Sequence, residues 1–211
     1  GRRPVNVIFE KRLPFPQAFE ESLSVRPLPE VHSTSTIPEL LDQYDQAFQE
    51  IAAFIREIPL DSFNVSGYPE GWSAARNVRH VTNTLSFLST YIGAPSWLHK
   101  IRGRHKSKLP PIEEVRPTNR PPRYDYGTYH PGKAASEELR EELIGKLQKA
   151  VEKFKKALQR RTEEELDQRK GAFGGMNLRL FAEFALKHMV FHLSVVRARL
   201  LAARNEKVEV G

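Results

Sequence analysis

Apolar side chains recur every three or four residues in four long stretches of the chain, which is the spacing that places them on one face of an α-helix. The predicted helices span roughly residues 37–58, 73–93, 135–160 and 177–204, and a short helix is expected at 162–168. Residues that favour helix N-caps stand at four of these starts: Thr36, Ser73, Thr162 and Asn177. Glu39 and Glu165 each follow such a cap by three residues, as in a capping box. The pattern therefore predicts an all-α fold, specifically a four-helix bundle.

Two segments interrupt this pattern. Residues 1–35 are mixed and rich in proline, and we expect an irregular, extended arm in which residues 5–9 form one short strand. Residues 94–133 contain seven of the fifteen prolines, which predicts a long crossover loop of a kind that is uncommon in compact domains and often functional. The chain is thus expected to comprise an arm, one helical domain and a tail, at residues 1–35, 36–205 and 206–211.

The amino-acid composition excludes several kinds of chemical site and a membrane-spanning segment. The 211 residues, 39% of them hydrophobic, suffice for one well-packed domain. The absence of cysteine excludes disulfides, thiolate metal sites and a cysteine nucleophile, so a transition metal would be bound by histidine, carboxylate and water. No apolar run reaches the roughly 18 residues of a membrane span, and the first residues lack the apolar region of a signal peptide. We therefore expect a cytoplasmic protein without a membrane partner.

Two histidines occupy the apolar stripe of the last predicted helix. His188 and His192 are four residues apart in "LKHMVFH", which places their side chains about 5–6 Å apart on one helix face. Two such imidazoles can share one metal ion, whereas each buried and unpaired imidazole would cost about 1–3 kcal/mol. Both could instead lie at the edge of the stripe and contact water or a carboxylate. His80, on another helix, adds a third imidazole, and three imidazoles with an open fourth position are typical of catalytic metal sites.

Two longer motifs carry a resemblance to a known family. "GWSAARNVRH" and "GGMNLRLFAEFALKHMVFH" are similar to motifs of the DinB/YfiT-like superfamily, whose members have Trp-Ser at a helix start and a histidine eight residues after the tryptophan. Trp72, Ser73 and His80 fit that spacing. The resemblance covers roughly residues 37–204. It implies a four-helix bundle in which His80, His188 and His192 bind one divalent metal ion, commonly zinc or nickel.

The resemblance also implies classes of reaction. Some members of the superfamily are thiol S-transferases or isomerases that use mycothiol or bacillithiol, so a small-molecule substrate and a low-molecular-weight thiol are the expected partners. Hydrolysis of a small electrophile is a second expectation, and catalytic residues are not identified. This chain lacks a defined thiol-binding motif, which leaves the reaction open. Three polar residues are candidates for contacts with the ligands or substrate, or are ordinary surface residues: Asn77, Tyr91 and Glu183.

Two alternatives to an enzyme follow from the same residues. The metal could tie two helices together in a non-catalytic binding module. Alternatively, residues 100–108 could bind nucleic acid or another anion, because cations occupy every second position there: Lys100, Arg102, Arg104, Lys106 and Lys108. A solvated charge run is the interpretation we favour for this segment. Pairing into a homodimer is left open, and the remaining histidines and Lys187 are expected to be solvated: His32, His99, His105 and His130.

Overall fold

The computed structural model describes residues 27–64, 72–118, 135–173 and 175–208, with the backbone alone for residues 202–208. Within these segments the ordered elements are helices, and the β-pairing present is limited to two isolated bridges. The prediction of an all-α fold is therefore confirmed. The strand expected at residues 5–9, most of the arm, and His130 lie outside the described residues.

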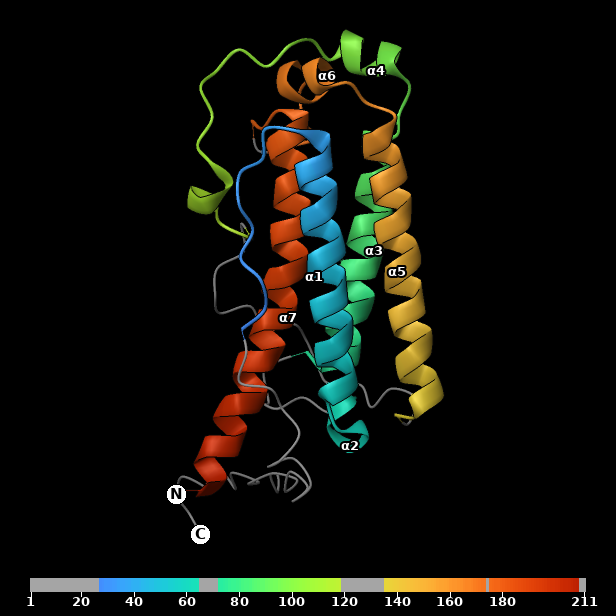
Figure 1. Cartoon of the computed structure of the whole chain (residues 1–211), viewed down its shortest axis with the longest axis vertical. Coiled ribbons are helices and arrows are strands. Elements are labelled where there is room, and N and C mark those ends of the chain that lie inside the picture. Colours follow the sequence, from blue (N-terminus) through green and yellow to red (C-terminus); the bar gives the residue numbers. More distant parts are fainter. Residues whose placement is uncertain (1–26, 65–71, 119–134, 174, 209–211) are drawn as a thin grey trace, which may run out of the picture.

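Four long helices make up most of the described chain, and we call them together the bundle (Figure 1). They are α1 (Ile37–Glu57), α3 (Ala74–Ile92), α5 (Glu137–Gln159) and α7 (Leu178–Val208). Four short elements connect them: α2 (Leu60–Phe63), α4 (Ser96–Ile101), the 3₁₀ turn η2 (Ile112–Glu114) and α6 (Glu163–Gln168). The last helix thus extends to Val208, into the segment expected to be a tail.

Local sequence explains where these helices begin. The Thr36 hydroxyl accepts the Glu39 amide and the Glu39 carboxylate accepts the Thr36 amide, which completes the predicted capping box. Thr162 and Glu165 do the same for α6. At α7, Asn177 Oδ1 accepts the Leu180 amide at 2.8 Å. Each cap satisfies backbone donors that have no partner inside the helix.

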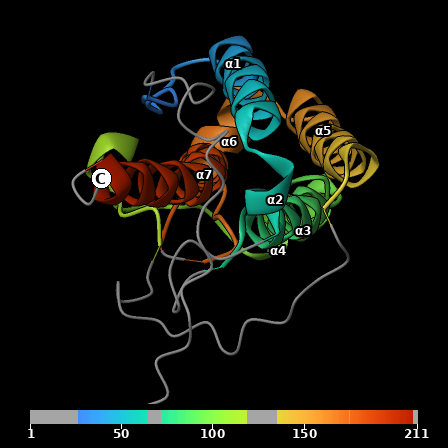
Figure 2. The same ribbon diagram turned by 90° about the horizontal axis from the view of Figure 1, so that it is seen from below.

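The long helices form a closed ring of neighbours. Figure 2, which looks along the bundle, shows α1 beside α5 and α7, and α3 completes the ring between the same two helices. In Figure 1, α1 and α7 run in one direction, whereas α3 and α5 run in the other. Because α3 and α5 are parallel neighbours, the chain between them must return along the length of the bundle. This requirement accounts for the long connection between Ile92 and Glu137.

Aromatic rings fill the centre of the bundle. Tyr44 of α1 and Phe154 of α5 are fully buried, and their rings stack with centroids 5.1 Å apart. The Tyr44 hydroxyl donates to the Ala182 carbonyl of α7 at 2.8 Å, so one side chain connects three helices. Burial, and secondarily the charge of Glu183, raises the pKa of Tyr44 well above its ordinary value. The hydroxyl therefore remains a donor at physiological pH.

The connection after α3 is more ordered than a simple loop. Its described part contains α4 and η2, and Arg161 anchors α4 by donating to the Ala94 carbonyl and the Ser96 hydroxyl. The prediction that His99 is solvated is wrong, because α4 turns its side chain inward against the Tyr91 ring and leaves it 1% exposed. Burial, together with the charge of Arg161, lowers the pKa of His99.

The described end of the N-terminal segment lies against α7. The amide and hydroxyl of Thr34 both donate to Glu183 Oε1 at 2.7 Å. The amide and hydroxyl of Ser33 donate to Oε1 and Oε2 of Glu113 in η2. Burial raises the pKa of Glu183, although the two donors from Thr34 lower it in part. In the described segments, no helix combines the length and the apolar character that crossing a membrane requires.

The packing of Phe154 gives a prediction for stability. Phe154→Ala should lower the free energy of unfolding by about 3–5 kcal/mol, because it leaves a cavity beside Tyr44. Urea unfolding followed by circular dichroism measures the change. Phe87→Ala is the matched control, since Phe87 is 73% exposed and its removal should change stability by less than about 0.5 kcal/mol. Equal losses in the two variants would contradict this account of the core.

Candidate metal centre

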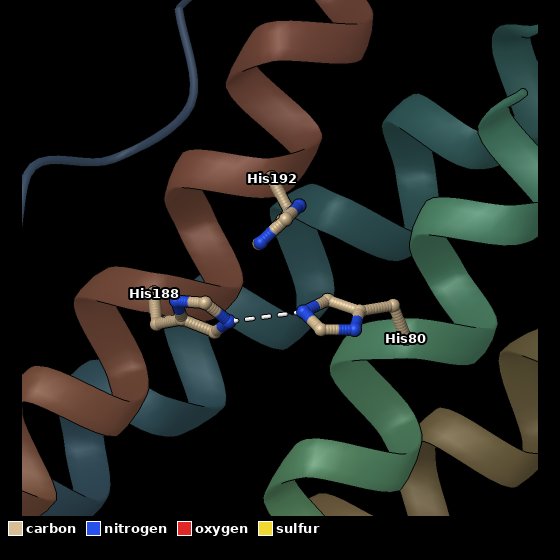
Figure 3. A group of neighbouring side chains, drawn as sticks. All are labelled: His80, His188 and His192. Atoms are coloured by element: carbon tan, nitrogen blue, oxygen red, sulfur yellow. Dashed lines mark hydrogen bonds between the residues drawn. The ribbon is translucent and has the colours of Figure 1, made fainter. Parts of the chain in front are cut away.

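Three histidines from two neighbouring helices point toward one another (Figure 3). His80 belongs to α3, while His188 and His192 lie one turn apart on α7. The two helices are antiparallel neighbours, so the early part of α3 faces the middle of α7. His192 is buried, and His80 and His188 are half-buried, which places the group near the edge of the core.

The ring nitrogens are close enough to share one ion. His80 Nε2 lies 3.2 Å from His188 Nε2, and each of the three residues offers a nitrogen within 4.8 Å of the others. Two nitrogens that bind one ion tetrahedrally at about 2.0–2.1 Å are separated by roughly 3.3 Å. The three side chains therefore form a cluster that could hold a divalent metal ion.

Hydrogen bonds on the far side of two rings fix which nitrogen faces the cluster. His188 Nδ1 lies 2.9 Å from the Pro117 carbonyl oxygen, which can only accept, so Nδ1 carries the proton. His192 Nδ1 lies 2.9 Å from Asn77 Oδ1. The Asn77 amide nitrogen donates to the Ser73 carbonyl at 3.0 Å, which orients this oxygen toward the histidine. Both rings consequently direct an Nε2 lone pair toward the cluster, as metal ligands require.

Aromatic side chains line the cluster. The Trp72 ring lies 5.0 Å from the His80 ring and 6.2 Å from the His192 ring, centroid to centroid. The Arg76 guanidinium lies over the Trp72 ring, 4.6 Å from its centroid. Trp72, the first residue of the motif spacing noted in the sequence, packs directly against two of the candidate ligands. An exposed cation therefore stands one ring away from the histidines.

Lys187 differs from expectation. It was predicted to be solvated, but its ammonium group donates to the carbonyls of Ile112 and Glu113 at 2.7 and 3.0 Å. The reason is that η2 folds back onto α7, which brings the two carbonyls within reach of the Lys187 ammonium group. Lys187 thereby holds the connection close to α7, a few residues before Pro117, whose carbonyl orients His188.

The other candidate residues lie at different places. Tyr91 is eleven residues beyond His80, about 16 Å along the helix, and its hydroxyl donates to the Lys170 carbonyl. Glu183 binds Thr34, as described above. Of the three polar candidates, Asn77 is the one whose described hydrogen bonds reach a histidine.

The cations of the basic segment lie near the end of the bundle that carries α4. Arg102 donates to the carbonyls of Gly171 and Ala172, and Arg104 lies 3.6 Å from Glu164. Lys100, Lys106 and Lys108 are exposed. This segment is therefore separate from the histidine cluster.

The Pro117 carbonyl is the functional group that sequence analysis did not identify. A backbone oxygen has no signature in the sequence, and its position depends on how the connection packs against α7. The contact of Lys187 with the Ile112 and Glu113 carbonyls could not be predicted either. Lys187 directly precedes the candidate ligand His188 and was expected to lie on a solvent-exposed helix face.

Comparison with known proteins identifies a family. The family model described as the DinB superfamily matches residues 43–196, a range that includes all three histidines. No curated protein and no solved structure matches the chain.

The geometry predicts the loss of metal on removal of either α7 histidine. Protein prepared without a nickel column should contain about one divalent ion per chain, while His188→Ala and His192→Ala should contain little. Mass spectrometry of the metal content measures this difference. His32→Ala is the matched control, because His32 is an exposed histidine outside the cluster and its removal should leave occupancy unchanged. Equal, near-zero occupancy in all of these proteins would contradict the prediction.

The hydrogen bond to His192 predicts a smaller effect for Asn77. Asn77→Ala should weaken metal binding by about 10–100-fold, because it frees the ring to rotate and to change its tautomer. Competition with a chromogenic chelator measures the affinity. Asn83→Ala, on an exposed position of the same helix, should bind as tightly as the unmodified protein. Unchanged affinity in Asn77→Ala would show that this contact does not position the ligand.

Proposed function

Because this chain belongs to the DinB superfamily, we propose that it is a metalloenzyme whose single divalent ion is held by His80, His188 and His192. The observation that carries the proposal is the 3.2 Å approach of two Nε2 atoms from different helices, with both His188 Nδ1 and His192 Nδ1 already committed to other partners. The proposed reaction is transfer of a low-molecular-weight thiol to a small electrophile, or hydrolysis of such an electrophile.

The donor set suits a limited group of metals. Three neutral imidazoles without thiolate or carboxylate favour borderline ions such as zinc and nickel over magnesium or calcium, which prefer oxygen ligands. Zinc or nickel is therefore the proposed cofactor. When bound, such an ion acts as a Lewis acid and lowers the pKa of a coordinated water or thiol toward neutrality.

The residues of the chain have distinct tasks in this proposal. Asn77 and the Pro117 carbonyl hold the Nδ1 protons of His192 and His188, so both rings remain in the tautomer that binds metal. The Trp72 ring covers one side of the cluster and limits the access of water from that side. Arg76, stacked on Trp72, supplies a positive charge that an anionic group on a thiol or electrophile can approach.

In thiol transfer, the thiolate sulfur forms a bond to the electrophilic carbon, and the leaving group departs with its electron pair. The thiol proton passes to solvent or to the leaving group. In the hydrolytic form of the reaction, water takes the place of the thiol. A cytoplasmic location fits these substrates and forms part of the proposal, whereas the oligomeric state is left open.

One observation favours a non-catalytic alternative. The cluster joins α3 to α7, two helices distant in sequence, so a bound ion would stabilise the bundle even if no reaction took place. This alternative predicts a lower melting temperature after chelation and no turnover of thiols. Nucleic-acid binding through residues 100–108 is a further alternative, and it predicts binding that weakens with salt.

An activity assay tests the proposal. Metal-loaded protein, a low-molecular-weight thiol such as bacillithiol and a small alkyl halide should give a thioether, detected by mass spectrometry, while a nitrophenyl ester tests the hydrolytic reaction. Chelation, or His192→Ala, should lower the rate on the order of 100-fold or more. His32→Ala should retain the full rate.

The result also separates the alternatives. Metal-loaded protein that is stabilised by the ion yet turns over neither substrate class would contradict the enzymatic proposal and support the binding module.

A further inference from the structure

The short helix α4 has its polar and apolar side chains in reversed positions. His99 is its buried residue, at 1% exposed, while Trp97, Leu98 and Ile101 are 61%, 39% and 73% exposed. Surface helices normally bury apolar side chains and expose polar ones. Three of the five large apolar side chains that the described residues leave exposed are therefore gathered on six residues.

Contacts on both sides hold α4 in this orientation. At the start of the helix, Arg161 donates to the Ala94 carbonyl and to the hydroxyl of Ser96, its first residue, at 2.7 and 3.0 Å. Within it, the His99 ring packs edge-on against Tyr91, with centroids 5.1 Å apart. After it, Arg102 lies over the same Tyr91 ring and donates to the Gly171 and Ala172 carbonyls. Rotation of α4 to bury its apolar side chains would break these contacts.

The surroundings of α4 are strongly basic. No aspartate or glutamate occurs between Glu70 and Glu113, whereas exposed cations occupy the end of α4 and the chain that follows: Lys100, Arg102, Arg104, Lys106 and Lys108. Acidic groups come from α6, where Glu164 lies 3.6 Å from Arg104, and Glu165 lies 3.6 Å from Arg161. Five exposed cations thus adjoin the apolar side chains.

The fold presents this surface at one end of the bundle. In Figure 1, α4 lies next to α6 at the end of the bundle where α7 begins, away from the end where α7 terminates. Gly93, just before α4, is thirteen residues beyond His80, about 20 Å along the same helix. The surface is therefore distinct from the histidine cluster and does not depend on the proposed metal chemistry.

We propose that α4 and residues 102–108 form a docking surface for an anionic phospholipid bilayer. The interfacial region of such a bilayer accepts tryptophan and aliphatic side chains, and its lipid headgroups attract lysine and arginine. The expectation of no membrane partner rested on the length of a spanning segment, and docking at the surface requires no such segment.

Charge and side-chain type favour the bilayer over other occupants. A second copy of this chain would bring five cations against five in a protein whose net charge is already +7. The phosphates of a nucleic acid would pair with the cations, and its bases could stack on Trp97. It offers no apolar phase, however, in which Leu98 and Ile101 could be buried.

Vesicle binding tests the proposal with the full chain. The protein should co-sediment with vesicles of phosphatidylcholine and phosphatidylserine but not with phosphatidylcholine alone, and added salt should release it. Trp97→Phe should lose the blue shift of tryptophan fluorescence that accompanies binding, because Trp97 is the exposed one of the two tryptophans.

Paired variants separate the two components of the surface. Trp97→Ser with Ile101→Ser should abolish binding. Lys100→Gln with Lys106→Gln should lower the partition coefficient by roughly 30-fold, because each cation near an anionic surface contributes about fivefold. Two controls should bind like the unmodified protein: Phe87→Ser, whose side chain is as exposed as that of Ile101, and Lys149→Gln with Lys156→Gln, on another face. Circular dichroism verifies that each variant is folded.

Several outcomes would overturn the proposal. It fails if the unmodified protein does not bind the anionic vesicles, or if the control variants lose binding as much as the α4 variants. It also fails if vesicles are not bound and Trp97→Ser with Ile101→Ser instead abolishes self-association, measured by sedimentation, or binding of an oligonucleotide.

Discussion

The candidate site depends on one contact between helices, the meeting of His80 on α3 with His188 and His192 on α7. Burial disfavours polar ring nitrogens that lack partners, and the rings of this cluster, at the edge of the core, have partners for their nitrogens. Two Nδ1 protons are donated outward, to Pro117 and Asn77, and the lone pairs that remain converge on a common volume. His80 Nε2, 3.2 Å from His188 Nε2, can either donate a hydrogen bond to one of these lone pairs or direct its own lone pair to a shared ion, so the arrangement could hold a divalent metal ion.

The segments between the helices share in building this site. Lys187 fastens η2 to α7, and the same connection then supplies the carbonyl that orients His188. Ser33 binds Glu113 of η2, and Thr34 binds Glu183, so the N-terminal segment secures the connection and α7 from the other side. The ligands are thus positioned by backbone and side-chain contacts that lie outside the four long helices. This division of roles is common where a rigid scaffold positions functional loops.

Local signals were the part of this structure that could be predicted from sequence. Thr36, Thr162 and Asn177 cap helices through contacts within four residues, and the four-residue spacing of His188 and His192 fixes their common face. His80 was included as a third imidazole from another helix, and the family resemblance supported its place in the site, because no periodicity relates α3 to α7. The burial of His99, the role of Lys187 and the Pro117 carbonyl were missed. Each depends on how a long connection packs, and its energy comes from tertiary contacts rather than from local propensity.

The separation between the histidines and α4 limits what docking at a membrane can accomplish. If α4 lies in the headgroup region, the bundle extends away from it, and the cluster is held about 20 Å from Gly93 along α3. That distance exceeds the roughly 5–10 Å to which an interfacial helix is buried, so a lipid that remains in the bilayer does not contact the histidines. In the proposed reaction, the substrate would therefore arrive from the aqueous side. Surface docking and the proposed thiol chemistry are consequently compatible, because the first decides where the protein is held and the second acts on water-soluble molecules.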